Sequence, residues 1–170
     1  NKTWWGQGHI VEGVGVGGAD ATGKTTMVRM VAVELEMDAG WCTSEAKVSY
    51  KPQHVKPEFA GTVQLWLVSE LGMIWRQVEF HMTVIRPLQV HTLLEQDVRR
   101  LSGGELHAVS IAICLGRAAD VYLLDEPSAH LDANARMEAA KAIRKTMEVN
   151  EKAAMVIDHD IYFIDIVSDS

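Results

Sequence analysis

Residues 18–25 read Gly-Ala-Asp-Ala-Thr-Gly-Lys-Thr and fit the pattern GxxxxGK[ST]. The Val- and Gly-rich stretch from Val11 to Gly18 comes before this motif, and a helical pattern from about Lys24 to Glu36 follows it. A buried strand, a tight loop and a helix in this order open an α/β unit, in which backbone N–H groups at the start of the helix surround phosphate oxygens. The stretch therefore predicts an α/β fold with a phosphate-binding loop.

The loop predicts ATP and Mg²⁺ as ligands. Lys24 is expected to reach the β- and γ-phosphates, and the Thr25 hydroxyl is expected to ligate Mg²⁺. A chance match in a Gly-rich loop is the alternative, and the position between strand and helix weighs against it. The residues expected to contact the nucleotide here are Gly18, Ala19, Asp20, Ala21, Thr22, Gly23, Lys24, Thr25 and Thr26.

A second chemical motif follows an apolar run from Val121 to Leu124. The run predicts a buried strand, and Asp125 would emerge at its end to hold the Mg²⁺ shell. Glu126 comes next and is positioned to deprotonate the attacking water, so we assign it as the general base. An acidic turn at the end of a strand is the alternative.

The stretch Leu101 to Glu105 reads Leu-Ser-Gly-Gly-Glu. Ser102, Gly103 and Gly104 would expose N–H groups and a hydroxyl at the start of a helix, which makes a second anion site. Because the first loop already holds its own nucleotide, this site is expected to close on a γ-phosphate bound by a partner domain. The alternative is an ordinary N-cap at Ser102 with a capping Glu105.

Two further residues follow predicted strands. Gln53 lies just after a strand that ends at Lys51, where its amide could sense Mg²⁺ and water, and His159 could hydrogen-bond the γ-phosphate. A solvent-facing Gln and a structural His are the alternatives. Residues 128–132, Ser-Ala-His-Leu-Asp, would lie where two domains meet, or else form a helix-entry turn with Asp132 as N-cap.

The expected fold class is α/β, a P-loop NTPase core with a parallel sheet flanked by helices and an inserted α-helical subdomain. We expect one domain over residues 1–170, a fragment of a longer protein, with its core in 1–56 and 115–170 and the helical subdomain in 57–114. The predicted strands are Ala46–Lys51, Val121–Leu124 and Ala153–Ile157, and the later helices cover parts of Thr62–Gln96, the stretch after Glu105 to Arg117, and Asn134–Val149.

The composition of the chain limits its expected partners and cellular compartment. A net charge of -7 gives no general attraction to nucleic acid phosphates or anionic lipid. Cys42 and Cys114 lie outside any CxxC spacing, which argues for a reducing compartment and against a metal cluster on this chain. No apolar run reaches the ~18 residues that span a bilayer. We therefore expect no membrane association and a cytoplasmic location.

The order of these motifs resembles the ABC ATPase family over essentially the whole chain. Some stretches look like the second nucleotide-binding domain of the ribosome-recycling RNase L inhibitor (Rli) family. The resemblance implies a twin-domain ATPase whose iron–sulfur domain is absent here, with a second ABC domain and the ribosomal small subunit as partners. The stretches are 48–53, Pro87-Leu88-Gln89, 101–106, 119–129 and 158–161.

This chain departs from the family pattern at three places. Asp20-Ala21 stands where the family usually has Asn-Gly, and Gly suits a backbone that approaches phosphate closely. His107-Ala108 replaces the common Gln-Arg, and His130 replaces Tyr. An ATPase of a membrane transporter and a non-hydrolysing ATP-binding module remain the alternative functions. Co-purification with a permease would identify the first, and retained nucleotide without phosphate release the second.

Overall fold

The computed structural model describes residues 3–4, 8–11, 14–17, 47–56 and 59–168. Within these residues, strands alternate with helices, as expected for the α/β class. The strands are β1 (Thr3–Trp4), β2 (Gly8–Val11), β3 (Val14–Gly17), β4 (Val48–Lys51), β5 (Val121–Asp125) and β6 (Ala153–Ile157), and the longer helices are α2 (Val63–Leu71), α4 (Gly103–Gly116), α5 (Ala133–Asn150) and α6 (Ile161–Ser168).

The described strands form one sheet in the order β1-β2-β3-β6-β5-β4. β3, β6, β5 and β4 are parallel, while β1 and β2 pair antiparallel at one edge. The prediction of a single strand from Val11 to Gly18 was therefore partly wrong, because Val11 ends β2 and Val14 begins β3 as its hairpin partner. The sequence shows only a Val/Gly run there, and pairing with a neighbour decides where each strand stops.

The parallel strands end at a common edge. Gly17 of β3 and Asp125 of β5 both pair with Ile157 of β6, and Lys51 of β4 pairs with Leu124. In open parallel sheets, ligands bind beyond this carboxyl edge. Gly17 is also the residue before the phosphate-binding motif, so the chain enters that motif at the same edge.

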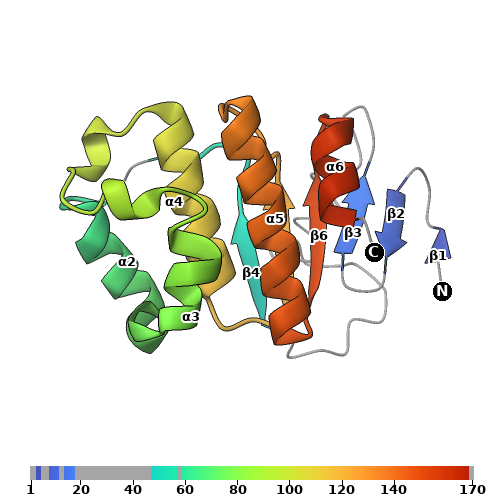
Figure 1. The fold of residues 1–170 in the computed structure, drawn as a ribbon, viewed down its shortest axis with the longest axis horizontal. Coiled ribbons are helices and arrows are strands. Elements are labelled where there is room, and N and C mark those ends of the chain that lie inside the picture. Colours follow the sequence, from blue (N-terminus) through green and yellow to red (C-terminus); the bar gives the residue numbers. More distant parts are fainter. Residues whose placement is uncertain (1–2, 5–7, 12–13, 18–46, 57–58, 169–170) are drawn as a thin grey trace, which may run out of the picture.

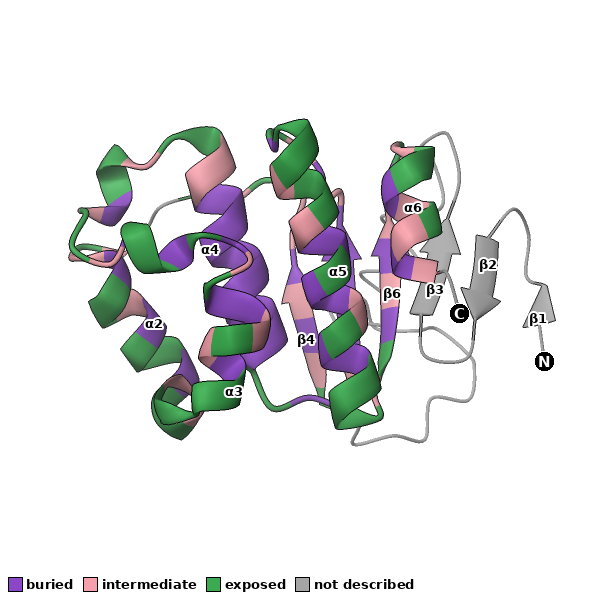
Figure 2. Ribbon diagram, viewed as in Figure 1, coloured by how far each residue is buried: buried purple, intermediate pink, exposed green. Residues whose placement is uncertain are grey.

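Helices cover the sheet and connect its strands. Figure 1 shows α5 and α6 lying across the sheet, with α4 beside β4. α4 is buried from Leu106 to Gly116, which Figure 2 shows as an almost continuous purple ribbon. This helix is apolar all round because it packs against β4 and β5 on one side and α2 on the other.

The segment between β4 and α4 is a set of short helices, as predicted for Thr62–Gln96. α2 is followed by η1 (Gly72–Arg76), α3 (Val78–Phe80), η2 (His81–Ile85), η3 (Val90–Thr92) and η4 (Val98–Arg100). The two ends of the segment are joined by backbone hydrogen bonds from Val63 N to Gln96 O and from Val98 N to Gly61 O, both 3.0 Å. The subdomain boundaries at 57 and 115 stay a prediction.

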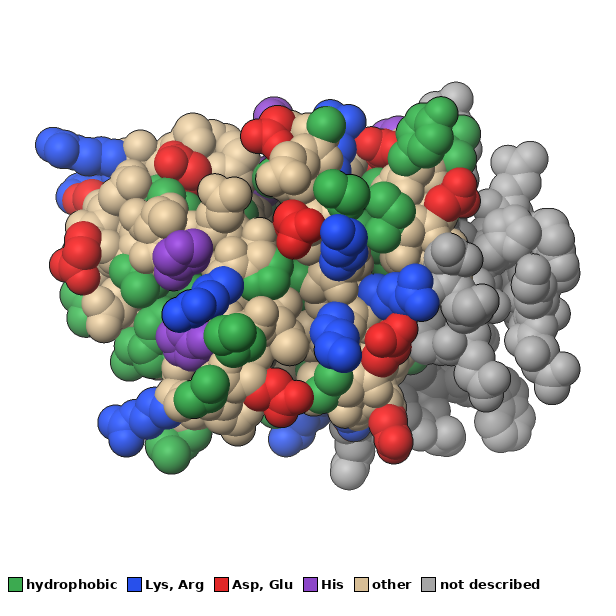
Figure 3. Space-filling view, in the orientation of Figure 1, with side chains coloured by type: hydrophobic (Ala, Val, Ile, Leu, Met, Phe, Trp, Pro, Cys, Tyr) green, Lys and Arg blue, Asp and Glu red, His purple; other side chains and the backbone are tan. Residues whose placement is uncertain are grey.

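Charge is mixed on the visible surface. Figure 3 shows acidic and basic side chains interspersed over the face that carries α5, in keeping with ion pairs such as Lys141–Glu138 (3.1 Å) and Arg144–Glu148 (2.8 Å) on that helix. Exposed pairs of this kind contribute little stability, about 0.3–0.5 kcal/mol each. This face has no single-sign field that would select a highly charged partner.

Candidate functional site

The site is built at the end of β5, where the chain turns sharply. Asp125 ends the strand and is 4% exposed, and Glu126 follows with a left-handed backbone, φ 45°. Glu126 N donates to the carbonyl of Ile157 on β6, at 2.7 Å. This bond ties the turn to the neighbouring strand, so the two acidic side chains are carried by backbone that the sheet itself holds in place.

Two residues predicted for catalysis meet here. His159 lies two residues beyond the end of β6, and its Nε2 is 3.2 Å from Oε1 of Glu126. Glu126 is 23% exposed and His159 is 59% exposed, so both side chains are accessible from the carboxyl edge. They are adjacent because β5 and β6 are parallel neighbours whose ends lie in register at Asp125 and Ile157.

Gln53 lies at the same edge, in a bend two residues after β4, and is half-buried. The described contacts give it no hydrogen bond to Asp125 or Glu126, so its proposed role toward Mg²⁺ stays a prediction. The strand that Gln53 follows, β4, is separated from β6 by β5.

Lys51 is a site residue that our sequence reasoning missed. Its side chain is 1% exposed, and Nζ donates to the backbone carbonyls of Asp125 (2.9 Å) and Glu126 (3.1 Å). Burial lowers the pKa of Lys51 to about 8, although the nearby carboxylates of Asp125 and Asp158 act to raise it. A Lys that ends a strand beside Gln53 was the available signal, since a buried ammonium requires partners.

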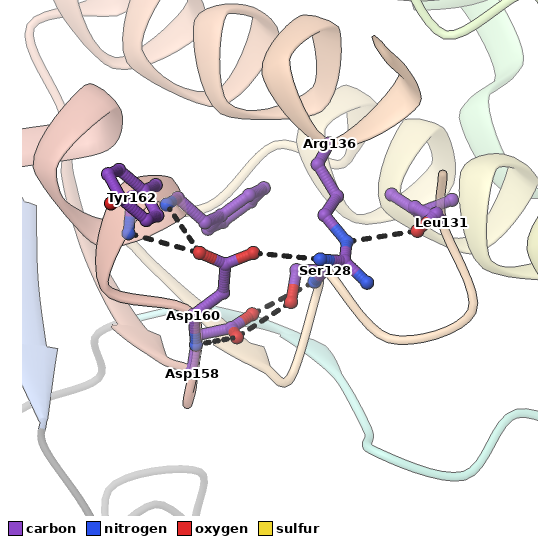
Figure 4. Close-up of polar contacts among 7 residues, drawn as sticks. Ser128, Leu131, Arg136, Asp158, Asp160 and Tyr162 are labelled. Atoms are coloured by element: carbon purple, nitrogen blue, oxygen red, sulfur yellow. Dashed lines mark hydrogen bonds and ion pairs between the residues drawn. The ribbon is translucent and has the colours of Figure 1, made fainter. Parts of the chain in front are cut away.

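The Ser-Ala-His-Leu-Asp segment is tied to the residues around His159, as Figure 4 shows. The buried carboxylate of Asp158 accepts hydrogen bonds from Ser128 Oγ (2.7 Å), Ser128 N (2.9 Å) and Asp160 N (2.9 Å). Asp158 also precedes His159 directly. The start of the segment and the position of His159 are therefore set by one carboxylate.

A second link lies farther along the same segment. Arg136 on α5 donates through Nε to the carbonyl of Leu131 (2.9 Å) and pairs through Nη1 with Asp160 (3.0 Å). The other oxygen of Asp160 accepts from the N–H groups of Tyr162 and Phe163 at the start of α6. Asp132 caps α5 by accepting a hydrogen bond from Ala135 N (2.8 Å). The alternative prediction for this segment, a helix-entry turn with Asp132 as N-cap, predicted this cap.

The predicted second anion site begins α4. Ser102 Oγ accepts from Glu105 N (3.3 Å), and a Glu105 carboxylate oxygen accepts from Ser102 N (2.8 Å), so the capping box is present. The first N–H groups of a helix have no intrahelical acceptor, and a hydroxyl that accepts one bond can still donate its proton. Capping and anion binding are therefore compatible at Ser102.

Glycine is required at the second position of this helix. A Cβ added to Gly104 would lie 2.7 Å from the carbonyl oxygen of His130, and one on Gly103 would lie 3.5 Å from the His130 ring. His130 itself has φ 62°. The start of α4 thus packs directly on the Ser-Ala-His-Leu-Asp segment, and a cleft of about 420 Å³ beside it is lined in part by Ser102 and Glu105.

The phosphate-binding motif, Gly18 to Thr26, lies outside the described residues, as does Cys42. Asp125 belongs to the predicted Mg²⁺ site and lies within the described residues. Mg²⁺ is usually held by one or two carboxylates with waters and substrate phosphates. A buried aspartate at the end of β5 fits that donor set. No group of three or more His, Cys, Asp or Glu suited to a metal occurs among the described residues.

Comparison with known proteins identifies this arrangement. The family described as ABC transporter matches residues 7–129. The chain belongs to this family. An Arabidopsis thaliana protein named ABC transporter E family member 3 is 36% identical over 151 residues, which cover 85% of this chain and 83% of that protein. A Methanocaldococcus jannaschii ABC transporter ATP-binding protein, MJ0719, is 45% identical over 166 residues, 95% of this chain and 27% of that protein.

Solved structures place this ABC ATPase domain in the Rli group. A structure titled RNase-L Inhibitor is 40% identical with a TM-score of 0.86, covering 99% of this chain and 34% of that chain. The archaeal ribosome recycling factor aABCE1, in complex with the archaeal ribosomal stalk protein aP1, is 39% identical with a TM-score of 0.85 and covers 99% and 34%. The ABC domain thus spans about a third of these solved chains. Within its described residues, no helix is long and apolar enough to cross a membrane.

Proposed function

We propose that this ABC domain binds Mg-ATP and hydrolyses it to ADP and phosphate at a site completed by a second ABC domain, and that the cycle serves ribosome recycling. The single observation that carries the hydrolytic part is the contact of 3.2 Å between Glu126 and His159, at the edge where β5 and β6 end. A carboxylate and an imidazole held together beside a buried aspartate suit water activation next to a phosphate.

The nucleotide is held by residues from three strand ends in this proposal. Lys24 and the backbone of residues 18–26 bind the phosphates, and Thr25, Asp125 and Gln53 hold Mg²⁺. The metal supplies charge neutralisation to the phosphate oxygens when it is bound. The burial of Asp125 supports its part, because a carboxylate in a low-dielectric position interacts more strongly with a cation.

Glu126 acts as the general base. Its carboxylate takes a proton from the attacking water, and His159 donates a hydrogen bond to a γ-phosphate oxygen while it stays in contact with Glu126. The hydrogen bond from Glu126 N to Ile157 O limits the movement of this carboxylate relative to β6. Positioning of this kind is a major source of rate enhancement in phosphoryl transfer.

The second anion site serves a nucleotide on the partner. Ser102, Gly103 and Gly104 are separated from the phosphate-binding motif by the whole helical segment. Gly103 and Gly104 begin α4, where N–H groups lack intrahelical acceptors. The cleft of about 420 Å³ beside Ser102 supports the binding of a group from outside this domain. The natural partner is a second ABC domain of the same polypeptide.

The ribosomal role is inferred from relatives. An archaeal protein whose structure superposes with a TM-score of 0.85 is titled a ribosome recycling factor and is bound there to a ribosomal stalk protein. We infer that the full polypeptide uses ATP-driven closing and opening of its two domains to separate ribosomal subunits, with the small subunit as partner.

Two variants in the full-length polypeptide test this proposal. Lys24→Ala should weaken ATP binding severely, because it removes the cation among the β- and γ-phosphate oxygens. Ser102→Arg should abolish most turnover at the partner's nucleotide while ATP affinity at Lys24 changes little. ATP binding is measured by calorimetry and turnover by phosphate release.

Two results would contradict the proposal. Unaltered ATP affinity in Lys24→Ala would remove the phosphate-binding assignment. Full turnover by the isolated domain, indifferent to the partner and to Ser102→Arg, would remove the composite site. The ribosomal part is tested separately, by ATP-dependent co-sedimentation with the small subunit, and its failure would leave the ATPase proposal intact.

A further inference from the structure

Lys51 is a buried cation directed at backbone oxygens. It is the last residue of β4 and is 1% exposed, so its ammonium cannot contact a nucleotide. Register explains its reach: Lys51 pairs with Leu124, and its side chain extends forward to the carbonyls of the next two residues, Asp125 at the end of β5 and Glu126 just beyond it. Nζ meets these carbonyls, those of Asp125 and Glu126, at 2.9 and 3.1 Å.

The two carbonyls belong to a turn in an uncommon conformation. Glu126 has φ 45°, a region that non-glycine residues seldom adopt without support from their surroundings. Its N–H is held by Ile157 O on β6 and its C=O by Lys51 on β4. The peptide units on both sides of Glu126 are thus held from opposite sides by strands β6 and β4.

An apolar side chain would fill the same space without taking an ion out of water. A buried ammonium is unfavourable unless it is well hydrogen-bonded, and here its two acceptors among the described residues are carbonyls of the Asp125–Glu126 turn. This contact acts directly on the orientation of that turn. Gln53 lies two residues beyond Lys51, so the same lysine connects the Gln53 bend to the turn.

We propose that Lys51 is a positioning residue for ATP hydrolysis, which holds the Asp125–Glu126 turn so that the Glu126 carboxylate stays at the attacking water. This inference rests on the proposed function. Lys51 acts through the two carbonyl groups that it binds. Removal of its donors releases the turn on the β4 side, while the bond to Ile157 remains on the β6 side.

Lys51→Met in the full-length polypeptide is the test, because Met keeps the length and apolar stem of Lys and lacks its N–H donors. We expect kcat to fall about tenfold or more, since small displacements of a catalytic group are that damaging, while Kd for ATP stays within about twofold. Hydrogen exchange at the amides of Asp125 and Glu126 should accelerate about tenfold, and exchange in β6 should stay unchanged.

Lys47→Met is the matched control, because Lys47 lies just before the other end of β4 and is exposed. It should leave kcat, Kd and exchange at the turn unaltered. If Lys51→Met does not fold, Lys51→Gln replaces it. Glutamine keeps a polar end group, but its shorter side chain places that group farther from the two carbonyls, so the same changes in kcat and hydrogen exchange are expected.

A kcat within twofold of the parent protein would overturn the inference. Parallel losses of kcat, ATP affinity and melting temperature would also overturn it, because they indicate a purely structural lysine. If the parent itself shows no ATPase activity, the proposed function fails, and hydrogen exchange alone then decides whether Lys51 holds the turn. Faster exchange confined to the amides of Asp125 and Glu126 supports this role, and unchanged exchange contradicts it.

Discussion

The imidazole of His130 lies edge-on against the imidazole of His107, with ring centroids 5.0 Å apart and an interplanar angle of 73°. Both positions depart from the pattern common in the family. His107 is buried in α4 and His130 lies in the Ser-Ala-His-Leu-Asp segment, so the contact joins α4 to that segment. The two departures therefore occur at one contact.

This contact predicts acid sensitivity. Burial, together with the nearby Lys51, His130 and His54, lowers the pKa of His107 from 6.5 to about 4. Nδ1 of His107 has no hydrogen-bond partner among the described residues, so no hydrogen bond from this atom favours the charged form. Between pH 6.5 and 4 the unfolded chain binds more protons than the folded chain, and the free energy of unfolding falls as pH falls.

Replacement of His107 should flatten that dependence. We expect His107→Gln to remove a slope of up to about 1.4 kcal/mol per pH unit between pH 6.5 and 4, measured by urea unfolding at several pH values. His91→Gln is the control, because His91 is exposed on a short helix. Parallel slopes for the parent and His107→Gln would show that His107 titrates normally.

The carboxylate of Asp158 predicts a loss of stability on substitution. Asp158→Asn leaves one carbonyl oxygen and one NH₂ group to face three donors, two from Ser128 and one from Asp160. The free energy of unfolding should fall by about 2 kcal/mol, since a buried donor loses a charged acceptor. Urea unfolding at pH 7 measures this change.

Asp165→Asn is the control for Asp158, because Asp165 is exposed on α6. It should unfold like the parent. Equal stability of the parent and Asp158→Asn would mean that the Ser128 donors find other acceptors, and the segment would then not depend on Asp158.

Glu126→Gln should separate binding from turnover. The amide keeps the shape of the side chain and a contact to His159 but cannot accept a proton, so kcat should fall about 100-fold or more with Kd for ATP unchanged. Glu151→Gln is a matched control: Glu151 is exposed and also has a left-handed backbone, φ 52°. Turnover within a few-fold of the parent would exclude Glu126 as the base.

The phosphate-binding motif predicts a gain of affinity. Ala21→Gly restores the residue usual in the family at a position where the backbone approaches phosphate, and ATP should bind several-fold more tightly in calorimetry if Ala21 strains the loop. Ala118→Gly, in an exposed loop before β5, should change nothing. Equal affinity for Ala21→Gly and the parent would show that the loop already follows a competent path.

Several features of this domain were predictable because they depend on neighbours in the chain. The boundaries of β6 matched the prediction, and those of β5 and α5 lay within one residue of it, because each apolar run ends at polar or turn residues. The capping box at Ser102 and the N-cap at Asp132 followed from the spacing to the third residue of each helix. The positions of Glu126 and His159 just beyond the ends of β5 and β6 were predicted by the same kind of reasoning.

The pairing register of strands that are far apart in the sequence decided the remaining contacts of the site. The sequence by itself determined that carboxylates and an imidazole end the strands, since alternation of strand and helix predicts a parallel sheet. Only the tertiary structure decided that Glu126 meets His159, that Lys51 reaches the carbonyls of the next strand, and that His107 lies against His130. A shift of one residue in strand pairing would redirect every side chain, and nothing local in the sequence specifies that register.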